Sequence, residues 1–455
     1  VLTLSNETFQ VVDITNRDDP QLRSSLELAR NVQSFAILPT PDGSTETYAV
    51  QLSGNWHIGD TKLTVTTLDD PDTVEPAAQF VLPAPYGRMF VNGSLVYVAS
   101  VHDVLAEDGS HTGARETRVD VVDFSDPLNP VQRGSVALPE EGSVGYHSWH
   151  WFSGDEVVQV NGSTLAFHRF QSFYYDCLAC GFAEDVVSPR PGDDPTHRIY
   201  VVDLSSPDDP VLGETIEIED VDWAWGLKGR DSTLYLSAYQ SFVKADGSWY
   251  ARYHLYRFDV SNPANVLHYP PVNTPGVFVD ASSNGEIIYT LENRWDRTLE
   301  QTRNYLYALR LEGPFATLES RVELRGYVNS ILVKGDAAFG TTYWWETIDE
   351  NGATRWVNHS SLVAIDLSSP QDIRITAEVE VPYNYSYLQE VEAGWAFIGS
   401  GAGLFIYEIS DLYEPTFEKF SRTQGWVQDV VYHHGNSYLP TGVYGVQVLT
   451  LGGTP

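Results

Sequence analysis

Short apolar runs recur along the whole chain, and none of them shows a sustained helical period of hydrophobic positions. Runs such as "YVVDL" and "LVYVAS" are continuous rather than alternating, which is typical of strands that are covered on both faces. Pro, Gly, Asp and Asn separate the runs, and proline both sets a turn and removes a donor from a β-ladder. The pattern predicts an all-β chain of many short strands.

One motif recurs along the chain: an apolar strand with an aspartate near its end, a turn containing proline, and a second strand. The clear copies are "VVDITNRDDP" from Val11, "VVDFSDPLNP" from Val121, "VVDLSSPDDP" from Val201, "RFDVSNPANV" from Arg257 and "AIDLSSPQDI" from Ala364. With four weaker copies, the equivalent positions are Asp13, Thr67, Asp123, Asp203, Asp259, Arg310, Asp366, Glu408 and Thr450. We expect the aspartate to be buried and to accept backbone N–H bonds from the turn.

Two further strands precede the motif in most copies, and a Gly-Asp or Asn-Gly turn joins them, as in "ILVKGD" and "MFVNGS". Each unit therefore holds four antiparallel strands, which we call a to d. Four-stranded units repeated at this spacing predict a single closed β-propeller over residues 1–455. We predict eight blades, one of which combines both termini, while seven or nine blades remain open.

The repeat resembles the LVIVD-repeat group of secreted bacterial and archaeal β-propellers, on the five clear copies quoted above. The resemblance implies the propeller fold and an extracytoplasmic location: secreted, periplasmic or at the cell surface. It implies no catalytic residues, because the group has no single activity, and a fold alone does not specify a function.

The loops that join strands b and c are long and vary in length, whereas the proline turns at the other end are short and uniform. Function usually lies on variable loops that a rigid scaffold presents. Aromatic residues on these hairpins form our predicted binding set: Tyr239, Trp249, Trp295, Tyr343, Trp344, Trp345 and Trp356. Flat aromatic side chains with polar rims suit sugars or a protein partner. Packing between blades is the alternative for each residue.

The innermost strand of each blade should line a central channel. Polar or charged residues near the start of these strands predict a wet funnel: Gln33, Arg88, His147, Asp222, Asn329, Tyr387 and Gln428. A structural water-filled channel is the alternative. The stretch "YHSWHWFSGD" reads as one inner strand, in which His147 and His150 point to opposite sides. The two histidines should therefore not chelate one metal, and Trp149 and Trp151 should pack between blades.

The two cysteines, Cys177 and Cys180, lie in the longest insertion, residues 170–197 of the fourth blade. A redox pair would need a helix start, and half a zinc site would need two further ligands, for which only His168 and His197 are near in sequence. We predict a Cys177–Cys180 disulfide, because a secreted chain favours that outcome.

The net charge of −35 disfavours nucleic acid as a partner, and no apolar run is long enough to insert into a membrane. No motif requires a cofactor. Structural calcium remains open, because acidic groups such as "EDGS", "PGDDPTH" and "DENG" lack the spacing of an EF-hand. We predict a non-catalytic protein that binds a protein or glycan partner through its hairpins, as a possible subunit of a surface assembly. The alternative is a polysaccharide lyase or a hydrolase of the lactonase type, with its site in the funnel.

Overall fold

The computed structural model describes most of the chain, and the segments it describes are residues 1–4, 8–27, 29–40, 45–55, 60–68, 76–84, 87–105, 111–139, 157–170, 197–243, 245, 247, 249–296, 301–350, 353–383 and 386–451. Within these segments the chain forms β-strands, turns and one 3-10 helix, η1 (Pro370–Asp372). None of these residues belongs to a helix that could span a membrane. The all-β prediction is therefore confirmed.

Among the described residues, seven sheets have four strands each, and in every sheet the strands pair antiparallel in chain order. The first three sheets contain β4 (Asn31–Ile37), β5 (Tyr48–Asn55), β6 (Asp60–Thr67) and β7 (Ala78–Leu82); β8 (Gly87–Asn92), β9 (Leu95–Leu105), β10 (His111–Asp123) and β11 (Val131–Ala137); and β12 (Val157–Asn161), β13 (Thr164–Phe170), β14 (His197–Asp203) and β15 (Val211–Ile218). The next two contain β16 (Trp223–Arg230), β17 (Thr233–Val243), β18 (Trp249–Asp259) and β19 (Leu267–Asn273); and β20 (Val277–Ala281), β21 (Ile287–Asp296), β22 (Gln301–Glu312) and β23 (Phe315–Leu324). The last two contain β24 (Tyr327–Lys334), β25 (Ala337–Glu350), β26 (Ala353–Asp366) and β27 (Arg374–Glu380); and β28 (Tyr387–Glu392), β29 (Trp395–Ser400), β30 (Gly403–Glu408) and β31 (Thr416–Arg422).

The two ends of the chain form separate three-stranded sheets. The N-terminal sheet contains β1 (Leu2–Leu4), β2 (Thr8–Asp13) and β3 (Gln21–Glu27), and the C-terminal sheet contains β32 (Val431–His433), β33 (Asn436–Pro440) and β34 (Val446–Thr450). The blade that was expected to combine both termini is not formed among the described residues, because the first three strands pair with one another and the last three do likewise. The sequence did not show that the strands at each end would pair among themselves and not with those of the other end.

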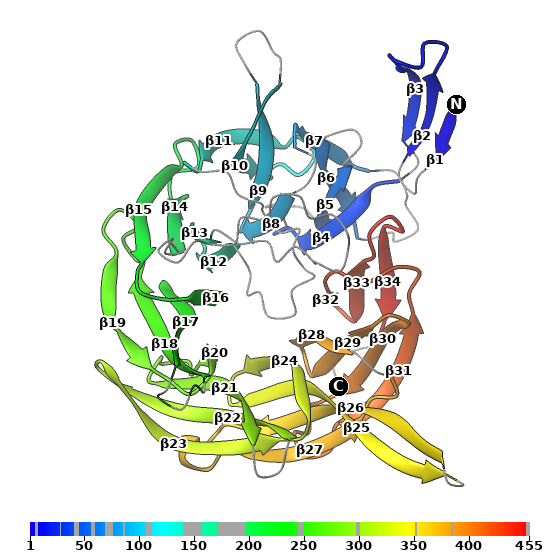
Figure 1. The fold of residues 1–455 in the computed structure, drawn as a ribbon. Coiled ribbons are helices and arrows are strands. Elements are labelled where there is room, and N and C mark those ends of the chain that lie inside the picture. The colour runs from blue at the N-terminus through cyan, green and yellow to red at the C-terminus, as the bar shows by residue number, and fades with distance from the viewer. Residues whose placement is uncertain are drawn as a thin grey trace.

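The four-stranded sheets and the C-terminal sheet follow one another around a common axis, which is the arrangement of a β-propeller (Figure 1). The sheet β1–β3 lies outside this arrangement, at the upper right of the same view. The C-terminal sheet lies next to β4, where the Val32 N–H donates to the Gly442 carbonyl at 3.0 Å and the Gly442 N–H donates to the Val32 carbonyl at 3.2 Å. The rings of Phe35 and Tyr438 also stack at 4.9 Å between these sheets.

Neighbouring sheets pack face to face through the apolar side chains of their strands. On β9, Val96 and Val98 face the sheet β4–β7 and pack in one cluster with Val50 and Leu63. The intervening residue Tyr97 faces the other way and packs against the sheet β12–β15. Each middle strand is therefore covered on both sides, which explains its continuous apolar sequence.

The repeat aspartates do accept hydrogen bonds from the turn that follows them. The backbone N–H two residues ahead donates to each carboxylate at 2.8–3.0 Å, as seen at Asp13, Asp123, Asp203, Asp259 and Asp366. The expectation that these aspartates are buried is wrong, because all five are only half-buried. An arginine on the next strand reaches three of them, at distances of 2.7 Å for Arg23–Asp13, 2.7 Å for Arg133–Asp123 and 3.2 Å for Arg374–Asp366.

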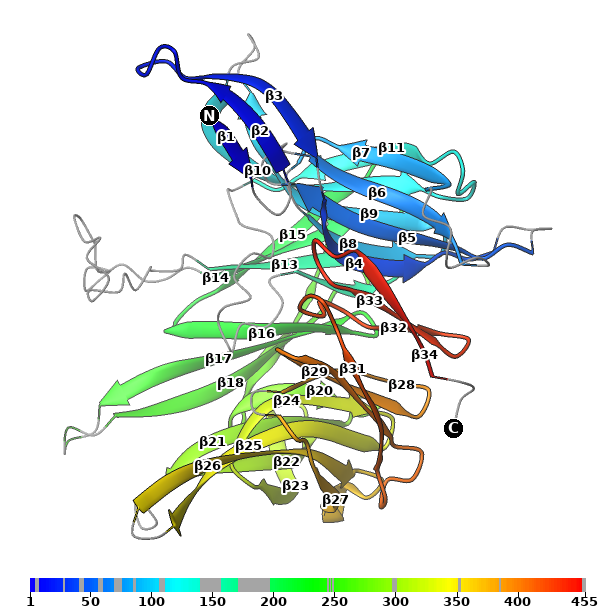
Figure 2. The same ribbon diagram turned by 90° about the vertical axis from the view of Figure 1, so that its right-hand side faces the viewer.

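We call the turns after these five aspartates the repeat turns. The repeat turns of the four-stranded sheets and the long b–c hairpins lie at opposite ends of the sheets, and Figure 2 shows the hairpins β17–β18 and β25–β26 pointing to the left. We call the end with these hairpins the hairpin end. The variable loops are therefore gathered at one end of the molecule, as the sequence predicted.

Candidate functional site

Three of the predicted binding aromatics lie on one face of the β25–β26 hairpin. Trp345 pairs with Asn358 across the ladder and Tyr343 with Ser360, so Tyr343, Trp345 and Trp356 project from the same side. Trp356 is 69% exposed and Trp345 is 43% exposed. We call these three residues the aromatic strip.

Tyr327, the first residue of β24, holds the inner end of the aromatic strip. Its ring stacks on Tyr343 at 5.3 Å and meets Trp345 edge-to-face at 5.6 Å, while Tyr343 and Trp345 are themselves edge-to-face at 5.2 Å. Contacts of this geometry fix ring orientation and are worth about 0.5–1.5 kcal/mol each beyond the buried area. The strip therefore presents large aromatic surfaces in a defined orientation.

Trp344 projects from the opposite face of the same hairpin. Its ring stacks on His359 at 5.2 Å, and the Arg325 guanidinium lies 4.0 Å from the ring centre. Glu346 lies 3.3 Å from the His359 ring nitrogen. Trp344 is half-buried and has a packing role on this face, whereas Trp345 and Trp356 are more exposed on the other.

The β17–β18 hairpin carries a second group of aromatic contacts. Tyr239 packs against Tyr253 at 5.8 Å, and Phe242 stacks on Tyr250 at 5.2 Å with the Arg252 guanidinium 4.9 Å from the Phe242 ring. Burial, together with the charge of Asp222, raises the pKa of Tyr239 above its usual value. The side chains of two other predicted members, Trp249 and Trp295, lie outside the described residues.

The inner strands share an irregularity that the sequence did not reveal. A β-bulge interrupts the pairing of the first two strands in six sheets, at Gln33, Val160, Val279, Asn329 and Gln389 and, in the sheet β16–β19, at Gly226 and Leu227. The bulges at Gln33 and Asn329 lie equally far from the start of their partner strands β5 and β25, so these two predicted residues occupy one level of the inner strands. The bulge at Gln389, two residues after the predicted Tyr387, lies nearer the start of its partner strand β29.

The other predicted funnel residues lie at different levels. Asp222 is exposed at the hairpin end, where its carboxylate accepts the Ser241 N–H and its own N–H donates to the Tyr239 carbonyl at 3.0 Å. Tyr387 meets Trp426 edge-to-face at 6.0 Å, and Gln428 is exposed just before β32. His147 lies outside the described residues, as do His150, Trp149 and Trp151. The predicted set does not form a single ring.

Two carboxylates, Glu390 in β28 and Asp429 just before β32, were not singled out from the sequence and affect each other electrostatically. Burial and the charge of Glu390 raise the pKa of Asp429, whereas the hydrogen bond from the Val430 N–H and the charge of Arg88 oppose that rise. Glu390 also forms an ion pair with Lys334 at 3.0 Å. Arg88, one of the predicted funnel residues, is thus close enough to act on a carboxylate from a different sheet. We call Arg88, Lys334, Glu390 and Asp429 the channel charge cluster.

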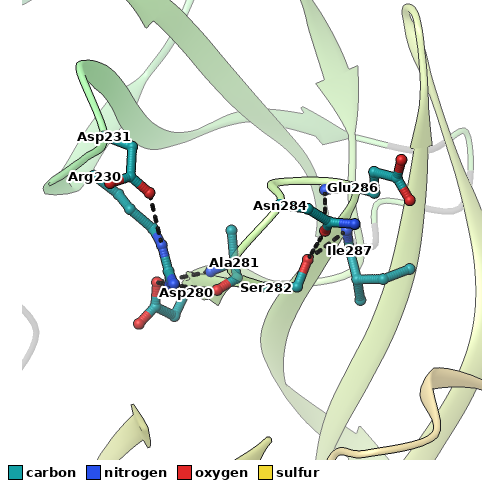
Figure 3. A network of polar contacts seen from close by, with 8 residues as sticks. All are labelled: Arg230, Asp231, Asp280, Ala281, Ser282, Asn284, Glu286 and Ile287. Carbon is teal, nitrogen blue, oxygen red and sulfur yellow. Dashed lines mark hydrogen bonds and ion pairs between the residues drawn. The ribbon is translucent and has the colours of Figure 1, made fainter. Parts of the chain in front are cut away.

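Polar contacts also join neighbouring inner strands, and Figure 3 shows one such network. The Arg230 guanidinium at the end of β16 donates to the Asp280 carboxylate of β20 at 2.8 Å and to the Ala281 carbonyl. Asp280 in turn accepts the Ala281 N–H at 2.7 Å. These groups are satisfied by one another, so they serve to join two sheets.

An open cleft of about 570 Å³ lies over the sheet β4–β7, beside residues 443–445, which precede β34. Its walls include Gln51, the buried Thr64 and Gln79 from that sheet and the exposed Tyr444.

A pair of histidines lies at the base of the long insertion in the sheet β12–β15. His168 Nε2 and His197 Nδ1 are 3.3 Å apart, and both side chains are buried. Burial, with a smaller effect of His197, lowers the pKa of His168 to about 3, and burial lowers the pKa of His197 to about 4. Cys177, Cys180 and the rest of the segment 171–196 lie outside the described residues, so the disulfide stays a prediction.

The residues that the structure describes contain no group of three or more His, Cys, Asp or Glu side chains arranged to hold a metal ion. Of the acidic groups considered for calcium, "EDGS" lies outside the described residues, and so does all of "PGDDPTH" except His197. Calcium binding therefore stays an untested expectation.

The sequence matches no protein-family model and no curated protein. Among solved structures, an acylaminoacyl peptidase in complex with Z-Gly-Gly-Phe-chloromethyl ketone aligns over 90% of this chain and 57% of its own, with 9% identity and a TM-score of 0.41. The β-propeller domain of the Trilobed protease from Pyrococcus furiosus aligns over 86% of this chain and 96% of its own, with 11% identity and a TM-score of 0.36.

A hypothetical selenium-binding protein from Sulfolobus tokodaii aligns over 70% of this chain and 73% of its own, with 13% identity and a TM-score of 0.34. This chain spans little more than half the length of the acylaminoacyl peptidase. Likenesses this distant concern the fold, and no statement about the activity of this chain rests on them.

Proposed function

We propose that the protein binds a protein or glycan partner through the aromatic strip at its hairpin end. The observation that carries the proposal is the exposure of Trp345 and Trp356 on the same side of a projecting hairpin. Large apolar rings that are exposed together are uncommon on a surface with no binding role. Planar aromatic rings provide contact area at little cost in conformational entropy, which suits both sugar rings and protein hot spots.

The proposal also concerns the fold that holds the aromatic strip in place. Eight sheets, from β4–β7 through β32–β34, form one closed ring, and the pair of backbone hydrogen bonds between Val32 and Gly442 supports that closure. The protein works outside the cytoplasm, in keeping with its resemblance to the LVIVD-repeat group. The net charge of −35 gives it a surface suited to cationic or neutral partners.

The test is a binding assay on the whole chain with two probe collections, an array of immobilised glycans and a set of purified cell-surface proteins. A Trp345→Ala/Trp356→Ala double variant should lose at least about tenfold in affinity, because a buried aromatic anchor typically contributes about 2–4 kcal/mol. Leu128→Ala removes a residue that is 49% exposed in a repeat turn, and it should leave binding unchanged. Loss of binding in the Leu128 variant alone would show that the opposite end makes the contact.

The alternative, a polysaccharide lyase or a hydrolase of the lactonase type, is favoured by one observation, the raised pKa of Asp429 beside Glu390. Two carboxylates in different environments can divide the roles of general acid and general base. If Asp429→Asn abolishes turnover of a polysaccharide or a lactone while Trp345→Ala does not affect it, the enzymatic alternative is correct. The same conclusion would follow from loss of turnover in Asp222→Asn or His147→Ala.

A further inference from the structure

The cleft over the sheet β4–β7 is lined by a row of polar side chains that crosses the sheet. The strand pairing places four residues opposite one another on β4 to β7: Phe35, Gln51, Thr64 and Gln79. At the inner end of the row, the ring of Phe35 stacks on Tyr438 of the C-terminal sheet. The three outer members line the cleft. On this row, contact with the C-terminal sheet therefore lies at the inner end, and the outer positions face the cleft.

The next sheet has apolar residues at the equivalent positions. Counted from the first residue of the second strand, Gln51 corresponds to Val98 in β9, and counted from the last residue of the third strand, Thr66 corresponds to Val122 in β10. Both valines are fully buried and pack against the preceding sheet. Gln51 and Thr66 line the cleft instead. The polar side chains at these positions therefore do not serve contact between sheets, and they turn hydrogen-bonding groups toward the cleft.

Two cations and two carboxylates lie beside the row and balance one another. The Arg30 guanidinium donates to the Asp60 carboxylate at 2.7 Å and forms an ion pair with Glu27. The Lys62 ammonium lies 3.5 Å from the same Glu27 carboxylate. Because each of these charges has an opposite charge next to it, the cleft does not require a charged ligand.

Tyr444 supplies an aromatic ring beside the cleft, and a tight turn fixes its backbone. The Thr441 N–H donates to the Gly445 carbonyl at 2.8 Å, and the Gly445 N–H donates to the Gly442 carbonyl at 3.1 Å. The φ angles are 68° at Gly442 and 80° at Gly445, which glycine adopts without strain. Tyr444 is 54% exposed, so its ring is accessible to a ligand in the cleft.

We propose that this cleft binds a neutral sugar, either free or at the end of a longer glycan. Amide and hydroxyl groups match the donors and acceptors of sugar hydroxyls, and an aromatic ring suits the apolar face of a sugar ring. The volume of about 570 Å³ lies within the roughly 300–1,000 Å³ of small-molecule sites. Gln51 and Gln79 hydrogen-bond the sugar hydroxyls, and Tyr444 stacks on the ring. The site is independent of the aromatic strip, which lies on a different sheet.

The test is a titration of the whole chain, followed by saturation-transfer NMR, with glucose, galactose, mannose and N-acetylglucosamine. Each is offered as the free sugar and as the terminal residue of an oligosaccharide. At least one should bind saturably, and the tighter of its two forms identifies the source of the ligand. Gln51→Ala/Gln79→Ala and Tyr444→Ala should each weaken that binding by about tenfold, because each removes hydrogen bonds or a stacking contact. Tyr444→Phe keeps the ring and should retain the affinity.

Tyr413→Ala is the matched control, because it removes a tyrosine that is 58% exposed outside the cleft. It should leave the sugar affinity unchanged, and so should the Trp345→Ala/Trp356→Ala double variant. Circular dichroism shows whether each variant folds, and Gln79→Ala alone, which alters an exposed side chain, replaces a double variant that does not.

The proposal is wrong if none of these sugars binds saturably, or if the folded cleft variants bind as the wild type does. Tighter binding of glucuronate than of glucose would show that the cleft selects a charge, and would also overturn it. Loss of sugar binding in the Trp345→Ala/Trp356→Ala variant alone would place the sugar on the aromatic strip and not in the cleft.

Discussion

The repeat turns and the β25–β26 hairpin lie at opposite ends of the sheets. They differ in whether their side chains have partners within the protein. In the repeat turns, one aspartate accepts a backbone N–H at nearly the same distance in five copies, and three copies add an arginine. On the hairpin, Trp356 is 69% exposed and Trp345 is 43% exposed, although Tyr327 and Tyr343 stack on each other beside Trp345. Repetition in the sequence therefore marks internal contacts, whereas the hairpin, which departs from it, carries exposed aromatic side chains.

The two faces of the β25–β26 hairpin also differ in how much their side chains are buried. Trp344 is enclosed by Arg325 and His359, while Trp345, its neighbour in sequence, points to the exposed side. Adjacent residues of the same type can thus have different roles, because successive side chains of a strand face opposite ways. The following variants test whether this division holds.

The largest expected effect is on binding, and it comes from the exposed face. Trp356→Ala alone should weaken partner binding by at least about tenfold, because a tryptophan anchor contributes about 2–4 kcal/mol once it is buried in an interface. The unfolding midpoint should hardly change, since the side chain is 69% exposed. Titration calorimetry and urea unfolding of the same preparation measure the two effects. A large loss of stability would instead assign Trp356 to packing.

The opposite pattern is expected for Trp344. Truncation to alanine removes its stack on His359 and its contact with Arg325, and we expect a loss of about 1–2 kcal/mol in the free energy of unfolding. Trp344→Phe keeps an aromatic ring and should recover part of that loss. If Trp344→Ala instead weakens binding tenfold with no change in urea midpoint, both faces of the hairpin contact the partner.

A smaller effect is expected at the repeat turns. Asp366→Ala leaves the Ser368 N–H and the Arg374 guanidinium without their shared acceptor, and we expect a loss of about 1 kcal/mol in the free energy of unfolding. Partner binding should stay unchanged. Asp372→Ala, in η1 of the same turn, is the control, because it removes another carboxylate and leaves the acceptor of the Ser368 N–H in place.

Acid should weaken the repeat turns before it affects the aromatic strip. Hydrogen bonds from Ser368, and then the contact with Arg374, lower the pKa of Asp366 below 3.8, and bonds from Thr15 and Arg23 lower that of Asp13 to about 2. A carboxylate with a depressed pKa contributes stability above its unfolded value, and this contribution is lost as the pH falls through the folded value. Stability should therefore decrease between about pH 4 and pH 2, and less steeply in Asp366→Asn. An unchanged slope in that variant would mean that other carboxylates dominate.

The disulfide prediction can be tested without any energetic measurement. Mass spectrometry under non-reducing conditions should find Cys177 and Cys180 in one oxidised peptide that does not react with an alkylating agent. Two thiols that alkylate readily would contradict it. Such a result would mean that two free thiols lie between His168 and His197 in the sequence.

Much of the scaffold could be predicted because its determinants are local. The strand runs, the turns and the hydrogen bonds of the repeat aspartates follow from residues within a few positions of one another. Their half-burial did not follow, because solvent exposure depends on how each turn lies at the end of its sheet, which neighbouring residues do not specify. The channel charge cluster was also missed, since Arg88 and Asp429 are far apart in sequence and come from different parts of the fold.

The β-bulges of the inner strands have a consequence for how the chain tolerates insertions and deletions. A bulge adds one residue to one strand, so the side chains before it lie on the opposite side from where strict alternation would place them. Deleting Asn329 would restore a continuous ladder between β24 and β25 in which Val328 and Ser330 keep their partners, so Tyr327 would still face Tyr343. The loss of one residue at the bulge would thus leave the support of the aromatic strip in place, whereas the loss of a residue elsewhere in β24 would shift part of the strand out of register.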